Sequence, residues 1–251
     1  MSPLTAPQAT ELFHVAFLDV LSRRLERDRY VLKGGANLRY FFDSVRYSQD
    51  IDLDVEGIPS WRLNEKIEAI LSSPQLGLLL RASGVAVARR SNPKHTDTTQ
   101  RWKVGLQGPG QPEEIPTKIE FSYREGKGES RAEAIPRRIV EPYALRPPLV
   151  PHYTGDAPTA QKVLALAGRS ETQARDVFDL DLLLRSRPLA PSSLDSATLA
   201  KAAELALRLP YAAFQGQVLP FLEADSVELY EDEGSWEQMR TFVAERLEGA
   251  R

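Results

Sequence analysis

Acidic and aliphatic side chains alternate in the segment DIDLDV, which spans residues 50–55. Successive side chains of a β-strand point to opposite faces of its sheet. The alternation therefore predicts a strand whose aliphatic residues enter the core. Asp50 and Asp52, with Asp54 beyond them, then project from the other face. A sheet with one apolar and one acidic face is the strongest constraint that this sequence places on its fold.

Carboxylates stacked on one face of a strand repel each other unless a cation lies among them. Oxygen ligands of this kind suit magnesium, which also binds substrate phosphates. Asp50 and Asp52 are therefore candidate metal ligands. An isolated Asp-x-Asp pattern fits a solvent-exposed acidic strand equally well, so this motif alone leaves both interpretations open.

Two glycines, Gly34 and Gly35, separate a short apolar segment at residues 30–32 from a helical pattern over residues 36–42. The order predicted is strand, glycine turn, helix. Glycine lets a backbone approach a phosphate closely, and the N-terminus of the following helix offers unpaired N–H groups to an anion. Gly34 and Gly35 are thus candidate nucleotide-binding residues, and a plain turn is the alternative.

A third carboxylate, Glu120, lies between two apolar residues in a further alternating segment at residues 115–123. Strands are also expected at residues 85–88 and 99–106, antiparallel to one another and to this segment. On a strand beside the Asp-x-Asp segment, Glu120 would complete a two-metal site or accept the proton of an attacking hydroxyl. Its alternative role is that of an ordinary surface residue.

The pattern changes after a proline-rich segment at residues 141–154, which predicts an irregular crossing between two domains. Only helical periodicity follows it, at residues 158–168, 173–185, 194–209 and 235–247. Helices are expected before it at residues 9–27, 36–42 and 61–71. The sequence predicts an α+β fold with a mixed or antiparallel sheet flanked by helices in residues 1–145 and a helical domain in residues 155–251.

Composition limits the class of protein. The 251 residues contain no cysteine, which excludes disulfides and favours a reducing cytoplasm, and no apolar run is long enough for a membrane span. The net charge of -3 argues against a protein that coats nucleic acid. Residues 89–103 include Lys94, Arg101, Trp102 and Lys103, which would contact nucleic acid by charge and stacking. A hairpin tip is the alternative for this segment.

The glycine turn, the Asp-x-Asp strand and the later apolar-acid-apolar strand together resemble the polymerase-beta-like nucleotidyltransferase superfamily. More closely, LKGGANLR at residues 32–39 and RYSQDIDL at residues 46–53 are similar to the AbiEii/AbiGii-type nucleotidyltransferases, toxin components of bacterial toxin–antitoxin systems. The likeness continues in QKVLAL at residues 161–166 and RDVFDL at residues 175–180. Ala36 departs from the pattern, because relatives usually carry a hydroxyl residue there.

This resemblance implies a nucleotidyltransferase catalytic domain followed by a helical domain that completes the active-site cleft. It also implies roles for individual residues. Asp50, Asp52 and Glu120 would bind two magnesium ions, Gly34, Gly35, Ser48 and Lys162 would bind a nucleoside triphosphate, and Asp176 or Asp179 would orient Lys162 or the incoming nucleophile. Asp50, Asp52, Glu120, Lys162 and Asp176 form the implied catalytic set.

The resemblance further implies an RNA acceptor, foremost the 3′ end of a transfer RNA, whose modification would block aminoacylation and translation. It implies a cognate antitoxin that either binds the toxin or controls its expression or modification state. Protein and small-molecule acceptors stay open, because they would use the same metal site. A noncatalytic triphosphate-binding module is a third class, but it would not need Asp50, Asp52 and Glu120 together.

Overall fold

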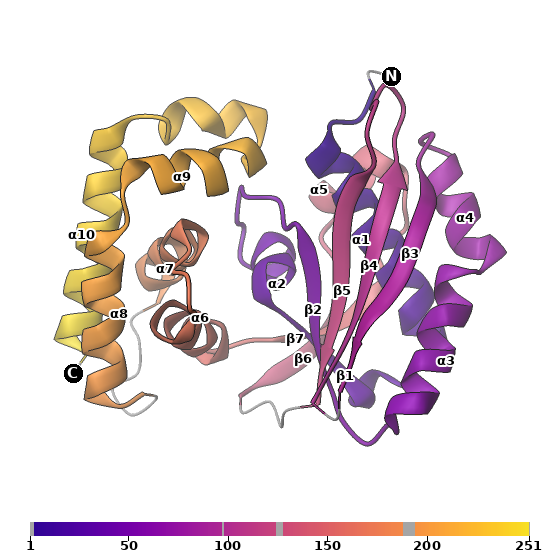
Figure 1. Cartoon of the computed structure of the whole chain (residues 1–251), viewed down its shortest axis with the longest axis horizontal. Coiled ribbons are helices and arrows are strands. Elements are labelled where there is room, and N and C mark those ends of the chain that lie inside the picture. The colour runs from indigo at the N-terminus through magenta and orange to yellow at the C-terminus, as the bar shows by residue number, and fades with distance from the viewer. Residues whose placement is uncertain (1–2, 97, 124–127, 188–193, 251) are drawn as a thin grey trace. The chain divides into compact units, whose positions relative to one another are not determined.

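The computed structural model describes residues 3–96, 98–123, 128–187 and 194–250. The described chain forms two compact units: Met1–Phe41 with Tyr47–Tyr153, and Phe42–Arg46 with Thr154–Arg251. Unit 1 holds a seven-stranded mixed sheet with helices, and unit 2 is helical (Figure 1). The α+β class predicted from the sequence is confirmed.

Unit 1 is organised around a sheet with strand order β3-β4-β5-β2-β1-β7-β6. The pairs β2–β5 and β1–β7 are parallel, and the other neighbouring pairs are antiparallel. The strands are β1 Tyr30–Lys33, β2 Asp50–Val55, β3 Ala86–His95, β4 Thr99–Gln107, β5 Ile115–Ser122, β6 Ser130–Ala134 and β7 Leu149–Tyr153. The acidic segment therefore forms the middle strand of the sheet.

Helices of unit 1 begin where local sequence signals place them. Thr5 and Gln8 form a reciprocal capping box at the start of α1, and Ser73 caps α4 by accepting from the Leu76 N–H group. The helices are α1 Ala6–Arg24, α2 Gly34–Phe41, α3 Ser60–Leu71, α4 Pro74–Arg81 and α5 Arg137–Val140. Short 3₁₀ turns occur at Arg27–Arg29 and Glu141–Tyr143. Helix α4 was not predicted.

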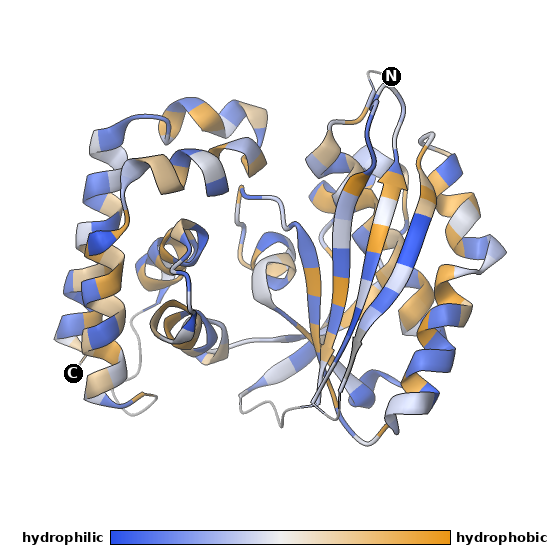
Figure 2. Cartoon of the chain, viewed as in Figure 1, coloured by the Kyte–Doolittle hydropathy of each residue, from blue (hydrophilic) through white to orange (hydrophobic). Residues whose placement is uncertain are grey.

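The two faces of the sheet differ as the alternation predicts, and strands in Figure 2 show alternating hydrophobic and hydrophilic bands. Ile51, Phe121 and Trp102 are fully buried in a core shared with α1, α3 and α4. The Trp102 indole N–H donates to the Glu68 carboxylate of α3 at 2.8 Å. The expectation that Trp102 stacks on nucleic acid is wrong, because its side chain points to the helix-covered face.

The prediction of an irregular crossing at residues 141–154 is also wrong in part. Residues 149–153 form strand β7, with Ala132 of β6 opposite Pro151. Proline removes one strand donor and is confined to positions where that donor is not needed. On its β1 side, β7 pairs only through Leu32 and His152. The short pairing between β1 and β7 therefore tolerates Pro151. The sequence predicts neither β6 nor β7.

Unit 2 packs its helices around a separate apolar core. Phe214 and Trp236 stack in this core with ring centroids 4.8 Å apart. The helices are α6 Ala157–Gly168, α7 Ala174–Ser186, α8 Ser196–Arg208, α9 Tyr211–Gln217 and α10 Glu233–Gly249, with 3₁₀ turns at Leu219–Phe221 and Ala224–Leu229. All four helices predicted for this half are present, and α9 is an addition.

A short segment of the N-terminal half, Phe42–Arg46, belongs to unit 2. Arg46 forms an isolated antiparallel bridge with Leu222, and the Glu223 N–H group donates to the Val45 carbonyl at 2.9 Å. The chain thus leaves unit 1 after α2, contributes to unit 2, and returns to unit 1 before β2.

Candidate active site

The junction of β1 and α2 brings the backbone against the acidic strand β2. Gly34 has a φ of 69°, a left-handed conformation that favours glycine. A Cβ atom at this position would lie 2.7 Å from Oδ2 of Asp52. Both the conformation and the close approach therefore favour glycine at position 34. Gly35 follows as the second residue of α2.

Gly34→Ala is expected to lower the free energy of unfolding by about 1–2 kcal/mol, because an L-residue is strained in this conformation. Displacement of Asp52 by the new methyl group adds to that cost. Denaturant unfolding followed by circular dichroism measures the change. Gly216→Ala is the control, since this helical glycine of α9 has no atom within 4 Å of the added Cβ position. Equal stability changes in the two variants would contradict the close approach.

Three carboxylates lie on the face of the sheet opposite the core formed with α1, α3 and α4. Asp50 and Asp52 alternate with buried Ile51 on β2. Strand β5 runs beside β2 with Lys118 opposite Asp50 and Glu120 opposite Asp52. The register therefore puts Glu120 next to the Asp-x-Asp pair, as a shared site requires.

The three carboxylates influence one another. Burial raises the pKa of Asp52, the negative charges of Asp50 and Glu120 raise it further, and Lys33 and Lys118 act in the opposite direction. The net direction is upward. Burial and two neighbouring carboxylates thus together disfavour the charged form of Asp52. This condition favours the binding of a cation.

Basic side chains from β5 and β4 pair with Asp50 and Glu120. The Lys118 ammonium lies 2.8 Å from Asp50 Oδ2, and the Arg101 Nε donates to Glu120 at 2.6 Å. Arg101 reaches Glu120 because it stands opposite that residue on β4. These pairings are partly exposed, so an added cation can replace them at modest cost.

Asp54, the third acidic residue of β2, has a different environment. Its carboxylate pairs with the Lys33 ammonium, which also donates to the Ser122 hydroxyl at 3.1 Å. The Tyr153 hydroxyl donates to the other oxygen of Asp54 at 2.9 Å. Both oxygens therefore have partners within unit 1, and Asp54 connects β1, β2 and β7 instead of facing a ligand.

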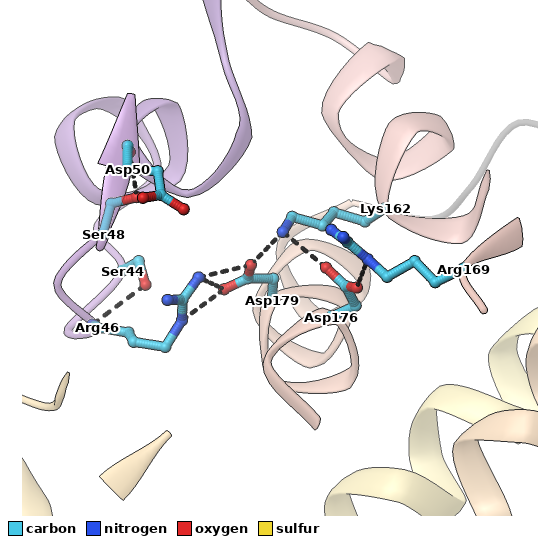
Figure 3. Close-up of polar contacts among 8 residues, drawn as sticks. All are labelled: Ser44, Arg46, Ser48, Asp50, Lys162, Arg169, Asp176 and Asp179. Carbon is cyan, nitrogen blue, oxygen red and sulfur yellow. Dashed lines mark hydrogen bonds and ion pairs between the residues drawn. The ribbon is translucent and has the colours of Figure 1, made fainter. Parts of the chain in front are cut away.

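Ser48 precedes β2 and is buried. Its hydroxyl donates to the Asp50 carbonyl at 2.8 Å, and Figure 3 shows the two residues together. The side chain therefore fixes the backbone at the start of the acidic strand. Its proposed contact with a triphosphate would require this hydroxyl to donate its one hydrogen to a phosphate oxygen in place of the Asp50 carbonyl.

Among the described residues, no group of three or more histidine, cysteine, aspartate or glutamate side chains has the spacing of a metal site. The donor set still fits magnesium in its chemistry, since Asp50, Asp52 and Glu120 supply only hard oxygen ligands. Burial and the charges of Asp50 and Glu120 raise the pKa of Asp52, so a cation among the three carboxylates would relieve their repulsion. Magnesium would therefore replace Lys118 and Arg101 as the partner of Asp50 and Glu120.

A second charged cluster lies within unit 2, and it contains Lys162, Asp176 and Asp179. Figure 3 shows the Lys162 ammonium between the two carboxylates, 3.0 Å from Asp176 and 2.6 Å from Asp179. Arg169 binds Asp176 at 2.8 Å, and Arg46 binds both oxygens of Asp179 at 2.8 and 2.9 Å. Three cationic side chains thus share two buried carboxylates.

The electrostatics of Asp179 follow from these partners. Burial would raise the pKa of its carboxyl, but Arg46 and Lys162 hold that pKa below its ordinary value. Asp179 and Arg46 are both almost completely buried. The carboxylate therefore stays ionised, and it ties the segment after α2 to helix α7.

Sequence reasoning missed several members of both clusters. Lys118 and Arg101 became relevant only when strand register placed them opposite Asp50 and Glu120. Arg46 begins the recognised RYSQDIDL motif and Arg169 follows the QKVLAL motif, but their partners Asp179 and Asp176 lie in helix α7, so no local pattern indicates these contacts. The one available signal was the alternation TKIEF at residues 117–121, which puts Lys118 on the same face as Glu120.

Comparison with known proteins gives the family. The sequence matches the family described as "Nucleotidyl transferase AbiEii toxin, Type IV TA system" over residues 16–245. The chain belongs to this family. The resemblance found in the glycine turn and the RYSQDIDL segment is thereby confirmed, and an AbiEii toxin is a nucleotidyltransferase of a type IV toxin–antitoxin system.

Solved structures share the fold of this AbiEii protein. JHP933 from Helicobacter pylori has a TM-score of 0.61 at 18% identity, covering 99% of this chain and 94% of that chain. MenT4, a nucleotidyltransferase toxin from Mycobacterium tuberculosis, has a TM-score of 0.58 at 16% identity, covering 97% and 88%. No curated protein matches the sequence. Within the described residues, no helix has the length and apolar character to cross a membrane.

Proposed function

We propose that this AbiEii protein transfers a nucleoside monophosphate from a nucleoside triphosphate to RNA in a magnesium-dependent reaction. The proposed acceptor is the 3′ end of a transfer RNA, and the proposed setting is the cytoplasm. The observation that carries the proposal is the concentration of Asp50, Asp52 and Glu120 on one sheet face beside the Gly34 backbone. Family membership supports the transferase class.

In the proposed reaction, an acceptor hydroxyl attacks the α-phosphorus and pyrophosphate leaves. Asp50 and Asp52 would hold the metal, and Glu120 would assist them or accept the proton of the attacking hydroxyl. Magnesium, when bound, supplies charge neutralisation for the triphosphate and makes the hydroxyl a better nucleophile. The Gly34 backbone can approach a phosphate because its position has no side chain.

Lys162 and Asp176 enter the proposal through the family resemblance. Lys162 is proposed to bind a phosphate, and Asp176 to orient the Lys162 ammonium. Their contact at 3.0 Å supports this positioning role for Asp176. With Arg46 and Arg169, the cluster around Lys162 contains three cationic side chains and two carboxylates. This excess of positive charge suits an anionic ligand.

An antitoxin is the proposed protein partner, because the family belongs to toxin–antitoxin systems. Addition of nucleotides to the 3′ end of transfer RNA would prevent aminoacylation, and translation would stop. The antitoxin would then limit this damage by binding the toxin or by changing its amount or modification state.

Asp50→Ala is expected to abolish label transfer from radioactive nucleoside triphosphates to RNA, because it removes a proposed metal ligand at the site of charge neutralisation. Purified wild-type and variant proteins are incubated with each labelled triphosphate, magnesium and total transfer RNA, and the products are separated on a gel. Asp28→Asn, at an exposed position before β1, is the matched control. Transfer by Asp50→Ala at the wild-type rate would remove the proposed site.

A further inference from the structure

The acidic face of the sheet continues into a basic one. In the register of β2, β5 and β4, Asp50 stands opposite Lys118, and Lys118 opposite Lys103. In the next row, Asp52 stands opposite Glu120, and Glu120 opposite Arg101. Neighbouring strands lie about 4.8 Å apart. Basic side chains therefore begin one strand away from the proposed metal ligands.

Strand β3 extends this surface. Arg89 stands opposite Gly105, which is two residues beyond Lys103 on β4 and so shares its face. Arg90 stands opposite buried Val104 instead, and it contacts Glu68 and Ser72 on the helix-covered side. We define the basic strip as Arg89, Arg101, Lys103 and Lys118.

The members of the basic strip are accessible to a ligand. Lys103 is exposed, and no ion pair joins it to another described residue. Arg89 has a side-chain exposure of 75%, and its pair with Glu114 is at the surface. Lys118 and Arg101 are partly exposed, and they pair with the carboxylates Asp50 and Glu120. A divalent cation bound to those carboxylates would release both side chains toward an anion.

We propose that the basic strip binds the phosphate backbone of the acceptor RNA and leads its 3′ end to Asp50 and Asp52. This inference rests on the proposed function and deepens it. Lysine and arginine contacts to phosphates position a nucleic acid without reading its sequence. The net charge of -3 is compatible with it, because the strip is local.

The composition of this surface favours a nucleic acid backbone over a protein. Large apolar side chains that are exposed in the described chain, namely Trp61, Leu78, Leu164, Leu207 and Leu229, all lie outside β3, β4 and β5. Protein interfaces usually centre on aromatic or aliphatic anchors. Since Trp102 is buried, the strip also has no indole for base stacking. Binding is thus expected to be mainly electrostatic.

The test is a double variant, Arg89→Gln with Lys103→Gln, because these two residues have no contact with the proposed metal ligands. A fluorescein-labelled single-stranded RNA oligonucleotide serves as the probe, without nucleoside triphosphate, and anisotropy is measured across a salt series. We expect affinity to fall roughly tenfold at low salt and the slope of log K against log salt to fall by about 1.4, near 0.7 for each lost phosphate contact.

The matched control is Arg62→Gln with Lys66→Gln, which removes the same charges from α3 on the helix-covered side. The control should bind RNA like the wild type, and both double variants should bind nucleoside triphosphate like the wild type. Unchanged RNA affinity and salt slope in the strip variant would overturn the proposal. A loss of triphosphate affinity alone would also overturn it and would assign the strip to the donor nucleotide.

This experiment separates the strip from the proposed function. RNA binding is measured separately from nucleotide transfer. If the wild-type protein binds RNA through the basic strip but transfers no label to it, RNA transfer is refuted and the proposed role of the strip in RNA binding stands. Conversely, label transfer to RNA by a strip variant with wild-type RNA affinity would support the function and refute the strip.

Discussion

Asp52→Asn is expected to reduce nucleotide transfer on the order of 10³-fold, the effect of losing a group that stabilises transition-state charge. The same substitution should raise the free energy of unfolding at neutral pH. Both effects have one cause, since the Asp52 carboxylate is buried and held close to Asp50 and Glu120, which together raise its pKa. Asparagine keeps the shape of the side chain and removes the charge.

The pH dependence of the stability gained in Asp52→Asn follows from the upward direction of the Asp52 pKa shift. An acid whose pKa is higher in the folded protein than in the unfolded chain destabilises the fold once both states are ionised. The cost begins as the pH rises through the ordinary value of 3.8 and is complete above the raised pKa. The stabilisation by Asp52→Asn should therefore be present at neutral pH and disappear in acid.

Denaturant unfolding at a series of pH values, without magnesium, measures the gain, and Asp28→Asn provides the control for loss of an exposed carboxylate. A variant that is inactive but less stable than the wild type at neutral pH would contradict the account of Asp52. It would show that the carboxylate supports the fold and is not held there for a ligand.

Arg46→Ala is expected to lower the free energy of unfolding by about 3–5 kcal/mol, because it leaves the buried Asp179 carboxylate with fewer compensating charges. Arg46 and Asp179 have side-chain exposures of 3% and 0%, and the guanidinium contacts both carboxylate oxygens. Lys162 alone would then neutralise Asp179 while also pairing with Asp176. Chemical denaturation of the full chain, followed by the unfolding of unit 2, measures this loss of stability.

The pKa of Asp179 gives this prediction a second readout. Because that pKa is lowered in the folded protein, its contribution to stability is present above the ordinary value of 3.8 and is lost as the pH falls through the folded value. Arg46→Ala should weaken this acid dependence. The paired substitution Arg46→Met with Asp179→Leu should recover much of the stability, since it removes one buried charge of each sign and leaves Lys162 paired with Asp176. A loss below about 1 kcal/mol in Arg46→Ala, typical of surface ion pairs, would contradict the role of this pair.

The sequence predicted those parts of the fold that depend on local pattern. Alternation identified β2 and β5, and helical periodicity identified the four longer helices of unit 2. Pairings between distant segments were not accessible in this way. Strand β7 contains Pro151 and was assigned to an irregular crossing, because a single sequence does not show that its neighbours require few of its donors.

In the candidate active site, too, local pattern predicts single residues but not the contacts between distant segments. Asp50, Asp52 and Glu120 followed from alternation and resemblance, and their proximity depends on a parallel register that no local pattern specifies. Trp102 was interpreted from its basic neighbours Arg101 and Lys103, although alternation puts it on the opposite face from both. Arg46 was part of a recognised motif, but its partner Asp179 is 133 residues away.

The most direct test of the central claim compares intact transfer RNA with transfer RNA whose 3′ end has been oxidised by periodate. Each is incubated with wild-type protein, magnesium and labelled nucleoside triphosphate. The account predicts label on the intact RNA and none on the oxidised RNA, which lacks the attacking hydroxyl. Equal labelling of both RNAs, or label on a protein or small molecule alone, would contradict transfer to the 3′ end of transfer RNA.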